Sequence, residues 1–251
     1  MPKALIKRLF LTFIMSFGVN PAFSACVDAA GPGVNWANCD KSGIDLENKD
    51  LTNAVFTGAT LDKANFTNTL LENADFNFSS LNGARFDGAR MNNSRMVAIK
   101  ALNASFKNTV LSNSRFSRSS LENADFSGAK ANSVNFYESK LVSANFKQAN
   151  LDKANFERAQ LKKANFDSAT LNNAIFISAR LRLASFNKAE MSKARLDKSD
   201  CRGTSFSQAN LTKASLKEAL IEESIFTGAI LKDTTWSDYK RCRATSVGTC
   251  E

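Results

Sequence analysis

The feature that most constrains this chain is an apolar residue at every fifth position over most of its length. From Leu46 to Trp236, all 39 residues at this spacing are apolar, and Ala, Ser or Thr stands two residues before 35 of them. Five residues advance an α-helix by about 500°, so these positions form no stripe on a helix. On a strand, an odd step alternates between the two faces. The pattern therefore predicts a chain that turns once in every five residues.

A second period of ten lies within the first, because the apolar residue alternates between Leu and Phe. If coils stack like residue over like, each coil contains an even number of pentads. Ten residues would make a coil too tight to enclose side chains, so twenty residues per coil are expected. At that spacing the Phe residues fall into two ladders, one from Phe66 to Phe226 and one from Phe56 to Phe176. Rings in each ladder would be separated by the strand spacing of ~4.8 Å.

The pentads have a recognisable form, as in Ala-Asn-Phe-Thr-Asn (64–68), Ala-Asp-Phe-Ser-Gly (124–128) and Ala-Asn-Leu-Asp-Lys (149–153). They resemble the pentapeptide-repeat family, and the resemblance extends over residues 46–236 without an insertion. It implies an all-β fold, a right-handed quadrilateral β-helix with four pentads per coil. This gives a pentapeptide-repeat solenoid of about ten 20-residue coils, which we expect to carry short disulfide-bonded end caps.

Residues 1–25 have the pattern of a cleaved secretory signal peptide. Lys3, Lys7 and Arg8 precede an uncharged apolar run, residues 9–17, that is too short to span a bilayer as a helix. Small residues follow near the expected cleavage site. Removal of this segment would lower the formal net charge from +9 to +6, and we expect a periplasmic or secreted protein.

Cys26 directly follows this segment, and a lipoprotein signal with a lipid on Cys26 is the alternative. We favour an ordinary signal peptide, because Phe23 occupies the position where lipoprotein signals usually have Leu.

Four of the five cysteines lie outside the repeats, near the two ends of the predicted solenoid. Ten coils at ~4.8 Å separate its ends by roughly 48 Å, whereas a disulfide requires Cα atoms within about 7 Å. We therefore predict one bridge in an N-terminal cap, residues 26–45, and one in a C-terminal cap, residues 237–251. The predicted pairs are Cys26–Cys39 and Cys242–Cys250.

Cys201 occupies an inward position, so we interpret it as a buried core thiol rather than a reactive one. The chain has no His and no Cys-x-x-Cys motif. These absences exclude His-based catalytic triads and argue against a metal site. Carboxylates such as Asp152 and Glu157 stand on a convex, solvated surface and have no apolar surroundings of the kind that a catalytic acid or base needs. We therefore predict a protein that is not an enzyme and has no cofactor.

One side of the predicted solenoid carries a cluster of cations that could bind an anion. No acidic residue occupies the outward positions of the three pentads centred on Leu141, Leu161 and Leu181. Lipopolysaccharide phosphates, an acidic polysaccharide, nucleic acid or an acidic protein are candidate ligands. The absence of interleaved aromatics disfavours a stacking platform for single strands. Charge that serves only solubility is the alternative. The residues are Lys140, Lys162, Lys163, Arg180 and Arg182, with Arg202 extending the cluster beside Asp200.

Outward apolar residues form a second candidate contact. Five lie on one side of the solenoid, namely Phe78, Val97, Tyr137, Ile175 and Ile177, and three more, Leu220, Ile225 and Ile230, lie near its C-terminal end. They could bind a partner protein or form a homodimer through that end, although scattered surface apolars need no explanation.

These observations favour a non-enzymatic exported solenoid that acts as a rigid interaction surface for a protein or polyanion. The family resemblance offers an alternative, a DNA mimic that binds gyrase and modulates topoisomerase activity. The positive net charge and the signal peptide oppose that alternative. A secreted effector that acts on a host is a third interpretation. We expect no small-molecule substrate, no specific nucleic acid and no transmembrane segment.

Overall fold

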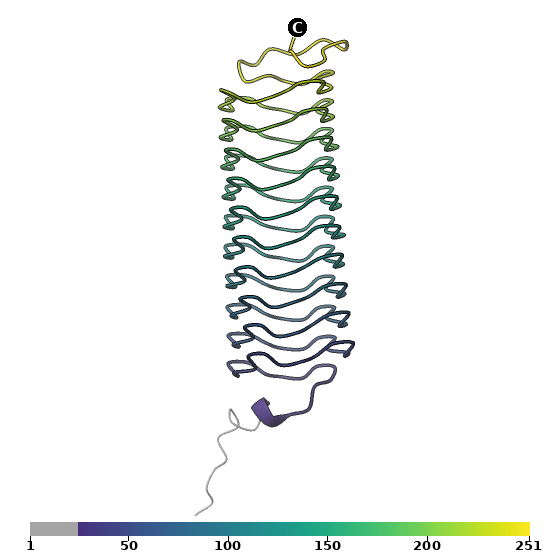
Figure 1. Cartoon of the computed structure of the whole chain (residues 1–251), viewed down its shortest axis with the longest axis vertical. Helices are drawn as coiled ribbons and strands as arrows, with labels where there is room; N and C mark the ends of the chain where they lie inside the picture. The colour runs from purple at the N-terminus through teal and green to yellow at the C-terminus, as the bar shows by residue number, and fades with distance from the viewer. Residues whose placement is uncertain (1–24) are drawn as a thin grey trace, which may run out of the picture.

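The computed structural model describes residues 25–251 as one continuous stack of coils (Figure 1). The only helix in this range is the 3-10 helix η1, Ala25–Val27. No strand in the described range is longer than one bridge residue; every fifth residue pairs in parallel with the residue twenty positions later. These bridges run from Asn35↔Val55 to Ser215↔Thr235. The coil of twenty residues expected from the register is therefore present. Except for Ala25, the predicted signal peptide lies outside the described residues.

Each pentad is a turn closed by its own backbone and joined to the next coil. The Ala54 N–H donates to the Leu51 carbonyl at 3.0 Å, and the Leu51 N–H donates to the Leu70 carbonyl of the following coil at 2.8 Å. The second turn residue, Asn53, has a φ of 60°. Because only Gly and a few polar residues adopt this left-handed conformation readily, Asn and Gly recur at this position of the repeat.

The two Phe ladders form part of the core, together with buried Leu and Ala residues, and contact each other. Within one ladder, Phe66 and Phe86 stack with ring centroids 4.7 Å apart and an interplanar angle of 1°. Between the ladders, Phe166 and Phe176 meet edge to face at 5.7 Å and 89°. The ladders predicted on opposite sides of the coil therefore meet across its interior, where both arrangements suit the quadrupole of the rings.

At the N-terminal end, the bridge register begins before the expected boundary at residue 46. Asn35 already pairs with Val55, and the register continues through the region expected to be a cap. The apolar series stops at Lys41, which occupies a central position, and for that reason the boundary was expected at residue 46. The Lys41 ammonium lies 4.3 Å from the centroid of the Trp36 ring, which is favourable for a cation–π contact. Trp36 is buried and its indole N–H donates to the Asp28 carbonyl at 3.2 Å.

Both predicted disulfides are present. Cys26 pairs with Cys39, with Cα atoms 5.6 Å apart, and Cys242 pairs with Cys250, with Cα atoms 4.8 Å apart. The sulfur of Cys26 is therefore occupied in a disulfide and is not free to carry a lipid. The bridges lie at the two ends of the coil stack, as the end caps require.

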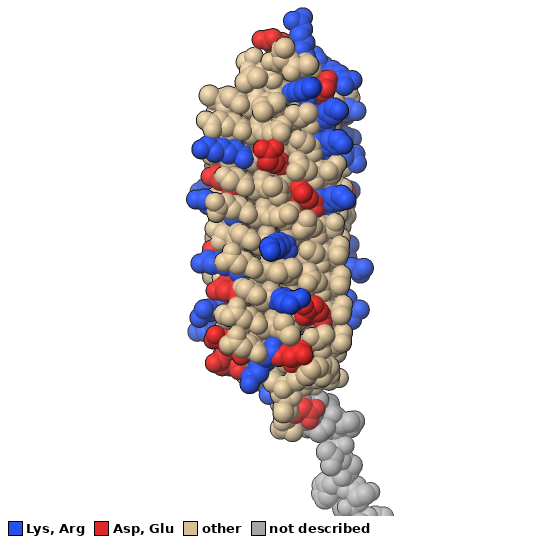
Figure 2. All heavy atoms as spheres, turned by 90° about the vertical axis from the view of Figure 1, so that its right-hand side faces the viewer, with Lys and Arg blue, Asp and Glu red and all other residues tan. Residues whose placement is uncertain are grey.

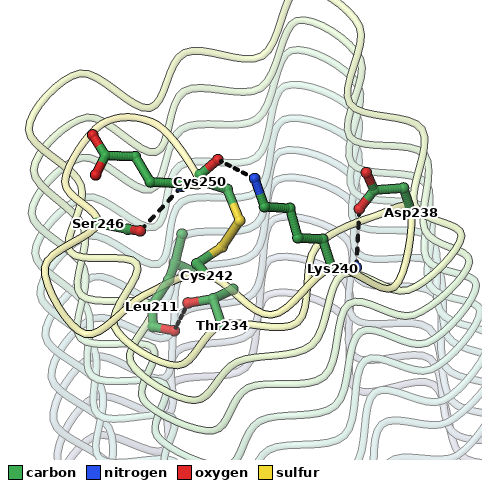
Figure 3. Close-up of a disulfide and its surroundings, with 8 residues drawn as sticks. Leu211, Thr234, Asp238, Lys240, Cys242, Ser246 and Cys250 are labelled. Carbon is green, nitrogen blue, oxygen red and sulfur yellow. Dashed lines mark hydrogen bonds between the residues drawn. A yellow bond between two sulfur atoms is a disulfide. The ribbon is translucent and has the colours of Figure 1, made fainter.

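The C-terminal cap, residues 237–251, folds back over part of the last coil. Two antiparallel bridges hold it there, Ile230↔Val247 and Thr235↔Arg241. Trp236 is only partly buried, and the cap leaves other residues of the last coil without a bridge partner on their C-terminal side. Figure 3 shows the cap disulfide with its neighbours, among them the Lys240 ammonium, which donates to the Cys250 carbonyl at 3.4 Å.

Candidate interaction surfaces

The coil register determines which outward side chains share a side of the solenoid. On the side centred on Leu161, the parallel bridges place Lys140, Gln160 and Arg180 in one column. At ~4.8 Å per coil, Lys140 and Arg180 lie about 10 Å apart along the axis. Next to this column, the Lys163 N–H donates to the Arg182 carbonyl at 3.0 Å. The structure therefore brings together the cations that the spacing predicted.

We define the cationic patch as the five residues Lys140, Lys162, Lys163, Arg180 and Arg182. All five are exposed. Within residues 25–251, none of them lies within 4.0 Å of a carboxylate oxygen in an ion pair. The other outward residues of these three pentads are uncharged. The patch is therefore a concentration of positive charge without a close ion pair in the described chain; the nearest acid in its column is Asp200, one coil beyond Arg180.

Arg202 differs from these five residues. Its guanidinium donates two hydrogen bonds to Asp200, each 2.8 Å long. This pairing lowers the pKa of Asp200, chiefly through the side-chain hydrogen bond. Because the charge of Arg202 is locally balanced, we do not include it in the cationic patch, although the sequence placed it there.

Leu183 lies within the patch and was not singled out from the sequence. Its side chain is 53% exposed and its φ is 60°. A Cβ atom placed on Gly203, one coil later, would lie 2.9 Å from Leu183 Cδ2. The Leu183 side chain therefore extends into the space above Gly203. The sequence did offer a signal for this residue: a leucine occupies the second turn position of the pentad, where Asn, Lys, Ser and Gly are common.

The apolar residues predicted on a neighbouring side differ in exposure. Phe78 is 68% exposed and has a φ of 63°. The other four, Val97, Tyr137, Ile175 and Ile177, are only partly exposed. This side therefore presents one projecting aromatic ring and no broad apolar surface.

Near the C-terminal end, Leu220 and Ile225 are 43% and 49% exposed. In the described chain, each bridges only to the preceding coil, because the cap does not reach them. Ile230 is exposed to a similar extent but bridges to the cap. Leu220 and Ile225 therefore lie on an unpaired apolar edge of the last coil.

Arg118, Glu138 and Arg158 stand twenty residues apart and form a charge ladder on the surface. The carboxylate of Glu138 lies 3.1 Å from Arg118 Nε and 3.5 Å from Arg158 Nη1. Hydrogen bonds from Tyr137 and then from Arg118 lower the pKa of Glu138. Such exposed pairs contribute little to stability, so the ladder is a local surface feature.

Charge is also distributed unevenly along the axis. Residues 26–75 contain eight Asp or Glu and three Lys, whereas residues 76–251 contain 27 Lys or Arg and 16 Asp or Glu. Figure 2 shows one side of the rod, with acidic side chains prominent toward its lower, N-terminal end. The net charge of the whole chain does not reveal this separation, so it was not predicted from that total.

Cys201 is buried, as expected for a core thiol. Burial raises the pKa of its thiol to about 12, against a smaller opposing effect of the hydrogen bond with Ser199. Because the thiolate is the reactive form, Cys201 is unreactive in the folded protein at neutral pH. No three His, Cys, Asp or Glu side chains cluster as a metal site within residues 25–251. In the same range, no helix has the length and apolar character to cross a membrane.

Two family descriptions match the chain. The pentapeptide repeat region matches residues 70–146 and 149–226, and pentapeptide repeats (8 copies) match residues 37–73. These matches cover more than half of the sequence, so the chain belongs to the pentapeptide-repeat family. The match to pentapeptide repeats (8 copies) begins at residue 37, in agreement with a bridge register that starts before Leu46.

Two solved structures align with most of the chain, and the first of them has a TM-score that supports a shared fold. A trypsin-treated form of QnrB1, a plasmid-mediated fluoroquinolone resistance protein, aligns with a TM-score of 0.50 and 15% identity, covering 74% of this chain and 90% of its own. HetL, a pentapeptide repeat protein involved in heterocyst differentiation regulation in Nostoc sp. strain PCC 7120, aligns with a TM-score of 0.30 and 22% identity, covering 84% of this chain and 90% of its own. No curated protein matches the chain significantly.

Proposed function

We propose that this protein is an exported, non-enzymatic solenoid that binds a polyanion through the cationic patch. The observation that carries this proposal is five exposed cations on one side of a rigid stack, without a carboxylate that pairs with them. Lipopolysaccharide phosphates, an acidic polysaccharide, nucleic acid or an acidic protein could supply the anion. Clustered cations on one surface raise the local concentration of such ligands.

The proposed scaffold is a right-handed quadrilateral β-helix of about ten coils. Four bridge columns per coil, spaced by five residues, support the four sides. Coils joined by regular hydrogen bonds hold the outward side chains at fixed spacing, which suits a rigid binding surface.

Export to the periplasm or the medium is part of the proposal. Two disulfides favour an oxidising compartment, and the signal peptide expected over residues 1–25 gives a route to it. A secreted effector acting on a host would use the same scaffold outside the producing cell, and fractionation of cells and medium distinguishes these locations.

The charge argues against a gyrase-binding DNA mimic. Such a mimic needs a strongly negative surface over much of its length, whereas this chain has a formal net charge of +9. Acidic residues outnumber basic ones in residues 26–75, but basic residues outnumber acidic ones in residues 76–251 taken together.

Retention on immobilised heparin tests the proposal. The double variant Lys162→Gln/Lys163→Asn removes two patch cations, and Asn is compatible with the left-handed φ of Lys163. We expect it to elute at lower salt than the wild type. The control, Lys193→Asn/Lys213→Asn, removes two exposed cations from the side half a coil away. Equal shifts for both variants would show that net charge, not the patch, determines retention.

A second contact at the C-terminal end is favoured by the unpaired apolar edge at Leu220 and Ile225. We propose that a second copy of the chain, forming a homodimer, or a partner protein covers this edge. Sedimentation velocity over a concentration series tests for the homodimer. The wild type should dimerise as its concentration rises, whereas the variant Leu220→Ser/Ile225→Thr should remain a monomer. A wild type that is monomeric at every concentration would refute the homodimer.

A further inference from the structure

Leu183 lies next to residues of the cationic patch, and attraction to a polyanion does not explain its exposure. Its side chain is 53% exposed, and its backbone has a φ of 60° that bulky side chains rarely adopt. Asn occupies the same turn position in many coils, for example at Asn103 and Asn123. A leucine here has both an unfavourable backbone conformation and an apolar surface in water, and neither is offset by burial in the described chain.

The pentads around Leu183 on this side carry mainly cations. Arg182 precedes it, and Lys163 occupies the same turn position one coil earlier. Gly203 occupies that position one coil later and leaves space for the Leu183 side chain. Val142, partly exposed, lies on the same side two coils before Arg182. The acid beyond the patch, Asp200, is held by Arg202. An aliphatic side chain therefore projects among cations that have no carboxylate partner.

We propose that this surface, the cationic patch together with Leu183, docks on an anionic lipid surface. The cations would contact headgroup phosphates, and Leu183 would enter the boundary between headgroups and acyl chains. This assignment rests on the proposed function and specifies its ligand. Basic side chains next to exposed aliphatic ones are the combination that proteins use at membrane surfaces. All five cations project from one side of a straight stack, so a single plane can meet them.

Soluble polyanions fit the same surface less well. An acidic polysaccharide would pair with the cations but would offer no apolar environment to Leu183. Single-stranded nucleic acid would require aromatic side chains for its bases, and the patch contains none. An anionic lipid surface supplies both the phosphates and the apolar layer.

Co-sedimentation with phosphatidylcholine vesicles, with and without phosphatidylglycerol, tests this proposal. The wild type should bind only the vesicles that contain phosphatidylglycerol. Each patch cation should contribute about fivefold to the partition coefficient, so Lys162→Gln/Lys163→Asn should lower it by more than tenfold. Leu183→Asn should lower it about tenfold. The same Leu183→Asn variant should elute from heparin at the salt concentration of the wild type.

The control Phe78→Asn makes a similar exchange of an exposed apolar side chain on another side, at the same turn position. It should leave vesicle binding unchanged. Asn tolerates the left-handed φ at both positions, so both variants should fold, and their thermal unfolding midpoints should equal or exceed that of the wild type.

The outcomes separate this proposal from the proposed function. If Leu183→Asn leaves vesicle binding unchanged while the lysine variant loses heparin retention, the lipid assignment is overturned and polyanion binding stands. If the lysine variant also keeps its heparin retention, both fail. An equal loss of vesicle binding for Phe78→Asn and Leu183→Asn would overturn the assignment to this side. Release of the protein from vesicles by inorganic phosphate, at constant ionic strength, would indicate a site for free phosphate and would also overturn it.

Discussion

Truncation of one ring in the middle of a Phe ladder tests what stabilises the coil stack. Phe146 is fully buried, and its centroid lies 4.9 Å from that of Phe126 and 4.8 Å from that of Phe166. It also meets Phe136 and Phe156 edge to face, each at 5.6 Å. A Phe→Ala change in a core costs about 3–5 kcal/mol. Each ring contact adds ~0.5–1.5 kcal/mol beyond area burial. We therefore expect Phe146→Ala to lower the free energy of unfolding by an amount near the upper end of the range of about 3–5 kcal/mol.

Urea unfolding followed by circular dichroism measures this loss. Phe146→Leu is the matched control, because Leu fills the same inward position in other pentads and keeps most of the apolar volume, at a cost below about 1.5 kcal/mol. The dependence of the unfolding free energy on urea should stay constant among the variants. If Phe146→Ala lowers the free energy of unfolding by less than about 1 kcal/mol, with that slope unchanged, the stacked rings are not what stabilises the coil stack.

Three further predictions concern the caps, the buried thiol and the surface ion pair. Replacing Cys242 and Cys250 by Ser should lower the stability of the C-terminal cap by roughly 2–3 kcal/mol, because the disulfide closes a short loop. Hydrogen exchange in residues 237–251 should become faster, and unchanged exchange would contradict this prediction. Cys201 should resist iodoacetamide at pH 8 in the folded protein and react in urea, because burial raises the pKa of its thiol to about 12; labelling without denaturant would show an accessible site. The pKa of Asp200 lies below its ordinary 3.8, so the stabilisation from its pairing is present above that value and is lost as pH falls through the lower folded value. Arg202→Gln should raise this pKa in an NMR titration, and no change would exclude the pairing.

The interior of the solenoid was predictable from the sequence because it depends on spacing alone. An apolar residue every fifth position and a Leu–Phe alternation every tenth determine the coil length, and the coil length determines which rings stack. The disulfide pairs followed from the same distance argument. The start of the register was harder to place, because Lys41 interrupts the apolar pattern, although Trp36 stands in register with the central residues and the backbone already forms a bridge at Asn35.

The surface was predictable only in part. The spacing of twenty residues correctly placed Lys140 and Arg180 in one column. It did not show that Arg202 is neutralised by Asp200 or that Leu183 remains exposed above Gly203. Pairing and exposure of outward side chains depend on how long, flexible groups orient against neighbours one coil away, which the repeat pattern does not specify.

The sequence by itself therefore determined the coil, its ladders and the disulfide pairs at its ends, because the coil and ladders follow from a strict period and the pairs follow from the length of the stack that this period gives. Only the tertiary structure decided which outward charges stay unpaired, how far the cap covers the last coil, and where an apolar side chain is left among cations. Those properties come from contacts between residues twenty positions apart whose side chains are free to rotate. The backbone period determines which side chains stand in one column, but it does not determine which of them pair with each other.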